Sequence, residues 1–325
     1  MLNGQSATEL SQRLEPSWDA PAAKVSSGAH ITPEIVERRW KRLPLPPEVR
    51  EPLLPPEDLP NITTYQHNIE NFIGIAKVPL GLAGPLRVNG LFAKGDYYLP
   101  LATTEAALVA SYHRGACLLS QAGGCSAMLL AEGVSRSPGF AFATARDAGL
   151  FVAWLTENLD AIRQAAEATT HHGQLSDLRI TIEGNHVYLL LDFYTGDASG
   201  QNMATIATEA ACRLIIERTP VQPEYFFVEA NMSGDKKASA QSFLSVRGKK
   251  VTAEAVIPAE LVEQMLHTSP AKMVDYWRMS AMGGVLSGTI GVQGHYANGL
   301  AALYLACGQD IACIAESASA SPASR

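Results

Sequence analysis

The chain has 325 residues, of which 47% are hydrophobic and 18% charged, and its formal net charge at pH 7 is −7. This balance is ordinary for a globular protein, the length fits one large or two modest domains, and the acidic charge argues against a nucleic-acid-binding surface. No run of about eighteen apolar residues occurs, and the first residues lack a basic-then-apolar signal pattern. We therefore expect a cytoplasmic protein.

The first part of the chain predicts a tail, a short helix and a group of strands. Residues 1–30 are rich in Ser, Ala, Pro and Gln, which favours a flexible N-terminal tail. The stretch TPEIVERRWKRL predicts an amphipathic helix capped at Thr32, and a proline-rich connector follows as far as Pro60. Short β-prone runs then alternate with Gly and Pro, and Asn89-Gly90 predicts a type I′ hairpin turn.

The stretch LATTEAALVASYHRG predicts a helix start that contains a single carboxylate. Thr103 or Thr104 can cap the helix, and the small apolar residues over 106–110 predict a buried run. Two explanations fit Glu105 at this position. A carboxylate in the first turn is stabilised by the helix dipole, and a carboxyl enclosed by apolar residues can also act as a catalytic acid.

The middle of the chain shows the pattern of a small separate domain. GFAFA (139–143) predicts a strand, and residues 144–170 predict one long amphipathic helix. Two strands around the Gly184-Asn185 turn follow, then a helix that opens at SGQNM and a last strand over 224–230. The order β-α-β-β-α-β is that of a ferredoxin-like domain.

The last part of the chain returns to a larger domain. A strand at KKVTAEAVIP, a helix near 259–267 and a Gly-, Ala- and Ser-rich helical region ending at Gly308 are expected. The closing stretch ESASASPASR is of low complexity, and 318–325 predict a C-terminal tail. We expect an α+β fold in which a large, mostly helical domain, built from 31–137 and 229–317, receives a ferredoxin-like βαββαβ insert at 138–228.

Motif inspection argues against metal sites and common nucleotide loops. The five cysteines form no CxxC pair, and the eight histidines show no HExxH spacing, so we expect buried reduced thiols and no metal. A GxGxxG fingerprint is absent from the sequence, and Gly248-Lys249 lacks the glycine that a P-loop needs five residues earlier. A dinucleotide would have to be held by another kind of loop.

Five polar constellations stand in apolar or glycine-rich surroundings. They are Glu70-Asn71 in IENFIG, Glu105 in ATTE, TGDASGQNM (195–203), NMSGDKKAS (231–239) and HYANGLAALYLACGQD (295–310). Taken singly, each is equally well explained by a helix cap, a solvated turn or a helix exit.

Together and in this order, the constellations resemble the 3-hydroxy-3-methylglutaryl-CoA (HMG-CoA) reductase family. The resemblance covers about residues 33 to 317 and rests on ENFIG, VPLGLAGPL, ATTE, GDASGQNM, DKK and CGQD. The forms ATTE and AGPL resemble the sterol-pathway and archaeal branch of the family more than the divergent bacterial branch. Within that branch, the chain resembles a soluble prokaryotic form.

The resemblance implies an NADPH-dependent oxidoreductase of isoprenoid precursor biosynthesis. Two hydrides would reduce the thioester of HMG-CoA to the alcohol of mevalonate and release CoA. Glu105 would be the catalytic acid, Lys236 would stabilise the oxyanion, and Asp310 would lie beside both. Apolar surroundings would disfavour the charged form of Glu105 and keep its proton available.

The remaining roles are also implied by matching positions. Residues 138–228 would form the NADP-binding domain, and the large domain would bind substrate and CoA. The cofactor residues would be Asp197, Gly200, Gln201, Asn202 and Met203, at a helix start that offers free N–H groups to a phosphate. The substrate residues would be Arg114, Arg136, Asp235, Lys237, Arg278, His295 and Asn298. Glu70 and Asn71 would lie at the dimer and CoA region, with active sites shared in a homodimer.

Several positions depart from the family pattern. Ala106 stands for a glycine, Arg278 for a lysine and Glu229 for a serine, and a carboxylate at 229 would repel a carboxylate substrate. Only fifteen residues follow Asp310 and none is a histidine, whereas the family has a histidine there that protonates the departing CoA thiolate.

The expected function is therefore HMG-CoA reductase, apparently truncated at the C-terminus. The alternatives are an impaired homologue that binds a CoA thioester or a nucleotide, and a half-enzyme completed by a second chain. NADPH is the expected cofactor, and NADH stays open because no ribose-recognition motif is legible.

Overall fold

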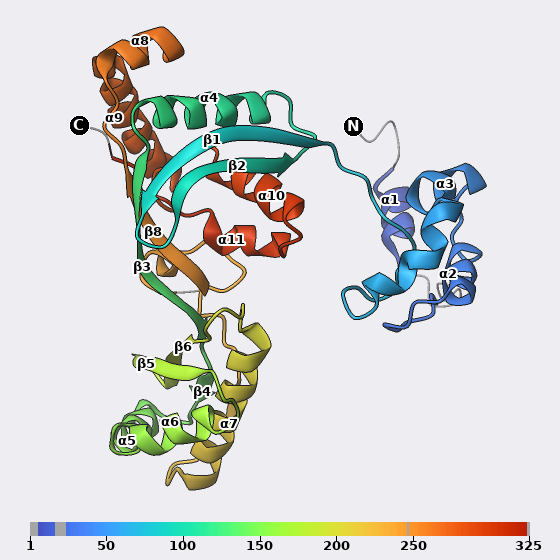
Figure 1. The fold of residues 1–325 in the computed structure, drawn as a ribbon. Coiled ribbons are helices and arrows are strands. Elements are labelled where there is room, and N and C mark those ends of the chain that lie inside the picture. Colours follow the sequence, from blue (N-terminus) through green and yellow to red (C-terminus); the bar gives the residue numbers. More distant parts are fainter. Residues whose placement is uncertain (1–5, 17–23, 246, 324–325) are drawn as a thin grey trace. The chain divides into compact units, whose positions relative to one another are not determined.

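The computed structural model describes residues 6–16, 24–245 and 247–323. Its chain contacts divide into two compact units, Met1–Val78 and Pro79–Arg325, each of which is considered by itself (Figure 1). Helices and a mixed sheet confirm the predicted α+β class. No helix in the described part of the chain is long and apolar enough to cross a bilayer.

The N-terminal unit contains more structure than its composition predicts. Within the expected tail, whose residues 1–5 and 17–23 lie outside the described part, α1 spans Ala7–Leu14. The predicted helix is α2 (Pro33–Trp40), and Thr32 caps it by accepting a hydrogen bond from the backbone of Ile35, as expected. The proline-rich connector is not extended chain. It folds into η1 (Pro47–Val49), α3 (Arg50–Leu53) and the 3₁₀ helix η2 (Pro56–Tyr65).

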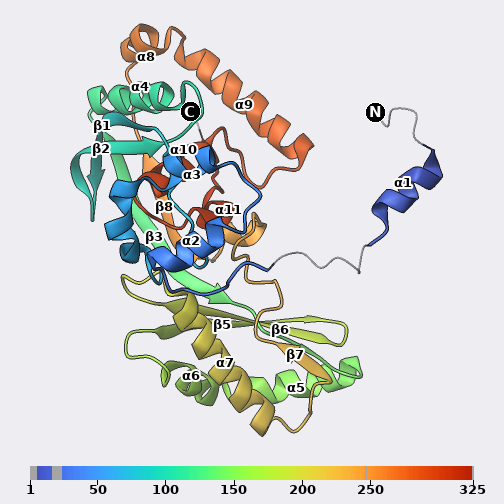
Figure 2. The same cartoon turned by 90° about the vertical axis from the view of Figure 1, so that its right-hand side faces the viewer.

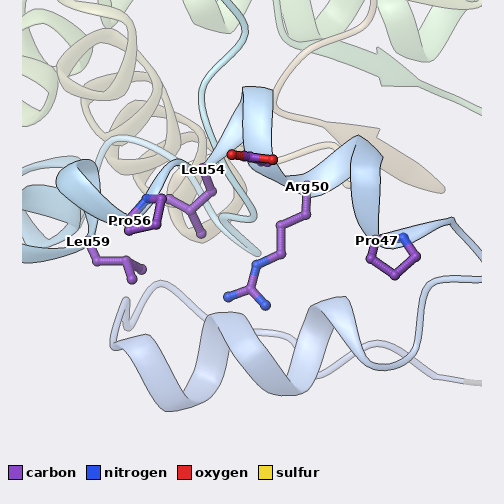
Figure 3. Close-up of a pocket in the computed structure, with 6 residues that line it drawn as sticks. Pro47, Arg50, Leu54, Pro56 and Leu59 are labelled. Carbon is purple, nitrogen blue, oxygen red and sulfur yellow. The ribbon is translucent and has the colours of Figure 1, made fainter.

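A small core explains why this connector folds. Trp40, Leu54 and Ile62 pack together with other apolar side chains, so the proline-rich turns bury one face. Arg39 is fully buried beneath them, and its guanidinium donates to the backbone oxygens of Ser26, Gly28 and Phe72. A pocket of about 200 Å³ also lies on this unit (Figure 3). Its lining residues are Pro47, Arg50, Glu51, Leu54, Pro56 and Leu59, none of which is a predicted site residue.

The C-terminal unit is organised around one eight-stranded sheet. Its first part consists of β1 (Leu80–Gly90), β2 (Lys94–Ala102), β3 (Cys125–Arg136) and β8 (Arg247–Glu254). The β1–β2 hairpin is confirmed, but its turn is not at Asn89-Gly90. Asn89 pairs with Lys94 within the ladder, and the Gly90 N–H donates to the oxygen of Ala93 across the exposed Leu91 and Phe92.

Two helices pack against this hairpin and carry candidate site residues. Helix α4 (Leu108–Gln121) packs on β1, and α10 (Tyr296–Ala306) packs on β2 (Figure 1). Their shared core includes Leu101, Leu108 and Ala302. The expectation that Thr103 or Thr104 caps α4 is wrong, because Ala107 adopts the left-handed φ of 64° and the helix begins only after it.

The predicted ferredoxin-like insert is present. Strands β4 (Gly139–Ala141), β5 (Gln174–Glu183), β6 (His186–Tyr194) and β7 (Tyr225–Phe227) run in the antiparallel order β7-β4-β6-β5. The helices are α5 (Ala145–Glu157), α6 (Leu159–Glu167) and α7 (Gln201–Arg218), which lie on the same side of these strands (Figure 2). Phe151, Leu189 and Ile215 belong to the core between the two layers. Residues 144–170 were expected to form one helix, but Asn158 leaves the helical conformation at φ −118° and separates α5 from α6.

The C-terminal part supplies further helices and loops. They are η3 (Ala240–Phe243), α8 (Ala259–Leu266), α9 (Pro270–Ser287), η4 (Ile311–Cys313) and α11 (Ile314–Ser317). The low-complexity ending is held to this unit. The Trp277 indole donates to the oxygen of Pro322, and the Val292 N–H donates to that of Ala320. Residues 324–325 of the expected tail lie outside the described part.

Candidate active site

Glu105 and Asn298 meet although they lie 193 positions apart in the sequence. The side-chain amide of Asn298 on α10 donates to Glu105 Oε2 at 2.7 Å. The Glu105 backbone N–H in turn donates to the hydroxyl of Thr103 at 3.0 Å, which fixes the turn before α4. The Glu105 side chain is exposed here, so the expectation of an apolar enclosure is wrong. The contact with Asn298 nevertheless gives the carboxyl one defined orientation.

The packing of α10 against α4 brings Asn298 to this position. The Tyr112 hydroxyl on α4 donates to the backbone oxygen of His295 at 3.0 Å, and the two rings meet edge to face. Burial raises the pKa of Tyr112, which keeps this hydroxyl protonated as a donor. Gly299 lies against the ring, because a Cβ there would stand 2.0 Å from the Tyr112 hydroxyl oxygen. The glycine therefore permits the close approach that the Asn298–Glu105 contact requires.

A second cluster surrounds Asp235, which is 8% exposed. Arg136 Nη1 donates to Asp235 Oδ2 at 2.9 Å, and the Gln201 side-chain amide lies 3.2 Å from the same oxygen. Arg136 also donates to the hydroxyl of Thr205 on α7. The guanidinium thus joins the end of β3, the start of α7 and the DKK loop. Sequence reasoning assigned Gln201 to the cofactor and Asp235 to the substrate, and the structure brings these two residues together.

Lys236 follows Asp235 directly and has an unusual backbone. Its φ is 59°, in the left-handed region, and its side chain is exposed, while Lys237 is half-buried. Residues hold such a conformation only where their surroundings impose it, and buried Asp235 is the neighbouring anchor. Within the described residues, Lys236 forms no ion pair with Glu105 or Asp310 at 4.0 Å or less. Lys236 is therefore not ion-paired with either of the other two predicted catalytic groups in the part of the chain that the structure describes.

Asp310 lies at the start of η4 and is 56% exposed. Its carboxylate accepts a hydrogen bond from the backbone of Ala312 at 3.0 Å, which caps the short helix. Arg247, at the start of β8, approaches the other carboxylate oxygen at 4.0 Å. The same guanidinium lies 3.6 Å from Asp235, so Arg247 connects the segments that carry Asp310 and Lys236.

The predicted cofactor loop forms a tight turn at the start of α7. Gly200 is the N-cap residue with φ 69°, and a Cβ there would lie 2.4 Å from the Thr195 side chain. The Thr195 hydroxyl donates to the oxygen of Ala198 and closes the turn. Asp197 and Asn202 are exposed, while the half-buried Met203 lies against Gly173. The turn leaves N–H groups at the end of an 18-residue helix available to an anion.

Other predicted residues lie away from these clusters or in the N-terminal unit. Arg114 is exposed on α4, and Arg278 on α9 is 69% exposed and pairs with Asp275. Glu70 is exposed, and Asn71 exchanges two hydrogen bonds at 3.1 Å with the backbone of Gly28. Asn71 thus has a role inside its own unit.

Glu229 has a structural role that its position did not predict. Its carboxylate accepts hydrogen bonds from the backbone of Ser137 and Asn231 and from the hydroxyl of Ser233, at 2.9 to 3.1 Å. These donors satisfy the carboxylate within the loop that leads to Asp235. Repulsion of a carboxylate substrate, which the sequence suggested, is reduced by this local neutralisation.

Sequence reasoning missed Arg247 and Glu316. Arg247 opens a strand that is rich in charged residues, a composition typical of a solvent-exposed edge, although its side chain is only 8% exposed. Glu316 opens the low-complexity stretch ESASASPASR, yet it is 4% exposed. The sequence signal that could have indicated burial of Glu316 is its position as a lone carboxylate among Ala, Ile and Cys. Nothing local in the sequence marks Arg247.

Glu316 gives a pH-dependent prediction. Burial raises its pKa, the charge of Asp235 adds to this effect, and Arg247 opposes it. The folded chain therefore holds this proton more firmly than the unfolded chain, and stability falls as pH rises from about 4.3 through the raised pKa. We expect Glu316→Gln to raise the free energy of unfolding relative to wild type at pH 8 and to lose this advantage near pH 4. Urea denaturation at both pH values measures it, with exposed Glu183→Gln as the control. A difference that is equal at both pH values would contradict the prediction.

The fold and the site together define an α+β protein in which a ferredoxin-like insert lies between the segments that supply Glu105 and Lys236. The sequence model of the family described as hydroxymethylglutaryl-coenzyme A reductase matches residues 35–323. The chain therefore belongs to the hydroxymethylglutaryl-coenzyme A reductase family.

Individual relatives agree with this assignment. The chain is 43% identical to the 3-hydroxy-3-methylglutaryl-coenzyme A reductase of Pyrococcus abyssi over 77% of its own length, and 42% identical to that of Haloferax volcanii over 78%. It spans 61% and 62% of the length of these two relatives. The reductase of Strongylocentrotus purpuratus is 37% identical over 75% of this chain and 26% of that protein.

A solved structure shares the fold at lower identity. The class II 3-hydroxy-3-methylglutaryl-CoA reductase from Streptococcus pneumoniae, bound to NADPH in open conformations, matches with a TM-score of 0.59 and 18% identity. The match covers 85% of this chain and 72% of that one. At this identity the likeness concerns the fold.

Proposed function

We propose that the chain reduces HMG-CoA to mevalonate with NADPH, in two hydride transfers, and releases CoA. The observation that carries this proposal is the Asn298–Glu105 hydrogen bond. It joins two segments distant in the chain whose side chains the family resemblance assigned to the same substrate. Family membership over residues 35–323 supports the reaction class.

The turn before α7 fits the phosphates of the cofactor. The Cβ that Gly200 lacks would fill the space beside Thr195, and the helix start presents N–H groups without intrahelical partners. NADPH, when bound, would supply hydride to the substrate carbonyl carbon. Asp197, Gly200, Gln201, Asn202 and Met203 are proposed to hold the cofactor, and Gln201 would couple its site to Asp235.

The protein's own groups would handle charge and protons. Reduction of the thioester places negative charge on the carbonyl oxygen, and the Lys236 ammonium is proposed to stabilise it. Collapse of this oxyanion breaks the C–S bond, releases the CoA thiolate and leaves an aldehyde. Glu105, oriented by Asn298, is proposed to donate the proton that the final alkoxide needs. Asp310 would set the charge balance around Lys236.

The other substrate roles rest on positions that the resemblance matched. Arg136, Asp235, Lys237 and His295 are proposed to line the substrate pocket. Arg114 is proposed to contact CoA, and Arg278 to hold the substrate carboxylate. A homodimer is also proposed. The apolar side chains of Tyr276, Met279 and Leu286 on α9 are 73% to 81% exposed, which supports contact with a second copy. Cytoplasmic location remains a prediction.

The test of the proposed reaction is NADPH oxidation by the purified chain, followed by absorbance, with HMG-CoA and separately with mevaldehyde. Turnover of HMG-CoA is the expected result. Reduction of mevaldehyde alone would show that the aldehyde step survives while thioester cleavage is impaired. Absence of oxidation with both substrates, in a folded protein that binds NADPH, would contradict the proposal and favour a binding-only homologue.

Gly200 provides a separate test of the cofactor site. We expect Gly200→Ala to weaken NADPH binding about tenfold, because a side chain at φ 69° costs about 1–2 kcal/mol and its Cβ would collide with Thr195. Fluorescence titration measures the binding, and thermal unfolding measures the fold. Gly149→Ala in α5 is the matched control, since its Cβ would enter open space in a helix and should be neutral or stabilising. Equal NADPH affinity in both variants would exclude this loop as the phosphate site.

A further inference from the structure

We propose that Arg247 is a positioning residue, which holds the loop of Lys236 and the segment of Asp310 in one arrangement for the same substrate carbonyl. This inference rests on the proposed function. Arg247 lies outside every motif that the family resemblance supplied, and the structure places its guanidinium between two of them.

The contacts of Arg247 reach two separate segments. Nη1 lies 3.6 Å from Asp235 Oδ1 in the DKK loop and 3.7 Å from Glu316 Oε1 on α11. Nη2 lies 4.0 Å from Asp310 Oδ2 and also donates to the sulfur of Cys313. One side chain at the start of β8 therefore contacts loop 231–239 on one side and segment 308–317 on the other.

The charges in this cluster require Arg247. Asp235 and Glu316 are almost fully buried, and Arg136 accompanies only Asp235. Without Arg247, two buried carboxylates would repel each other, with one of them unpaired. Buried ion pairs give little net stability because desolvation offsets their attraction, whereas removal of the shared cation leaves buried carboxylates uncompensated. The cluster is therefore better suited to fixing an arrangement than to adding stability.

The cluster around Arg247 also adjoins two proposed catalytic groups, Lys236 and Asp310. Lys236 follows Asp235 directly in the left-handed conformation, so the orientation of Asp235 sets the path of the Lys236 side chain. Asp310 and Glu316 bracket η4 and most of α11, so contacts to both fix the position of this segment.

The ion pairs of Arg247 are long. Distances of 3.6 to 4.0 Å are ion pairs rather than direct hydrogen bonds, and Arg247 Nη1 has no hydrogen-bond partner within the described ranges. The guanidinium therefore acts on the two segments mainly through its charge and its position between them.

The test uses Arg247→Lys, which keeps the charge but loses the planar fork that reaches both segments. We expect kcat for HMG-CoA to fall about 10²-fold while the KM for NADPH is unchanged, because a misplacement of about 1 Å is sufficient for such a loss. Arg87→Lys is the matched control, because Arg87 forms a half-exposed pair with Asp96 outside the site.

Hydrogen–deuterium exchange gives a readout that does not depend on turnover. In Arg247→Lys, peptides from 231–239 and from 308–317 should exchange faster together, while peptides from the insert core stay unchanged. Exchange that rises in neither segment or in only one of them, or an unchanged kcat, would overturn the positioning role. If the wild-type chain transfers no hydride, the proposed function fails, and the exchange experiment still decides whether Arg247 joins the two segments.

Discussion

Replacement of Lys236 by Ala is expected to lower kcat for HMG-CoA by about 10²–10³-fold, because the oxyanion formed on hydride addition would lose its nearest cation. The fold should be retained. Lys236 is exposed, and Ala keeps the same Cβ at φ 59°, so the substitution adds no backbone strain. NADPH affinity should be unchanged. Steady-state kinetics and NADPH titration on the same preparation measure both quantities.

Chemical rescue makes the Lys236 experiment specific. Exogenous ethylammonium should restore part of the turnover of Lys236→Ala, because it can place an ammonium where the side chain was. Lys94→Met removes an exposed lysine of the β1–β2 hairpin and should leave kinetics unchanged. Wild-type turnover in Lys236→Ala would remove this residue from the mechanism.

Replacement of Glu105 by Gln is expected to lower kcat by about 10²–10⁴-fold with little change in KM. Gln retains an oxygen that can accept from Asn298, so the geometry of the contact is preserved while the transferable proton is lost. The loss should be present with mevaldehyde as substrate, because the final alkoxide is formed in that step. Kinetics with each substrate provide the measurement.

The matched control for Glu105 is Glu132→Gln on β3, whose carboxylate pairs with Lys249. It should behave as wild type. Full activity of Glu105→Gln with both substrates would show that another group supplies the proton, and the Glu105–Asn298 contact would then be structural.

The insert could be predicted because its periodicities are strong and local. Strands β5 and β6 alternate around a Gly-Asn turn, and the apolar faces of α5, α6 and α7 repeat at helical spacing. The break at Asn158 could not be predicted from periodicity, because it depends on a single residue that leaves the helical conformation. The Asn158 side-chain amide donates a hydrogen bond to the backbone oxygen of Trp154.

The ATTE segment shows how local preference is overridden by packing. Threonine caps and small apolar residues favour a helix from about residue 104, and the structure begins α4 at Leu108. Leu108 packs with Leu101 and Ala302, so the tertiary core rather than the cap sets the first helical residue. Glu105 remains on the turn before the helix. Its side chain is exposed and accepts a hydrogen bond from Asn298, instead of being enclosed by apolar residues.

The candidate site was predictable where motifs carried it and hidden where long-range packing formed it. Glu105 and Asn298 were assigned separately, and their contact spans 193 positions. Arg247 and Glu316 carry no motif, because their significance lies in burial that neither a charged strand pattern nor a low-complexity ending reveals. Glu229 shows the same limit, since its carboxylate is satisfied by loop donors that only the fold supplies.

The most direct test of the central claim is the stoichiometry of the reaction with HMG-CoA. Oxidised NADPH, free CoA thiol and mevalonate are quantified in the same reaction mixture for the wild-type chain and for Lys236→Ala. The account predicts two NADPH oxidised for each CoA and each mevalonate formed by wild type, and no significant product with the variant. CoA release without NADPH oxidation, or NADPH oxidation equal in wild type and Lys236→Ala, would contradict a reductase site built on Lys236.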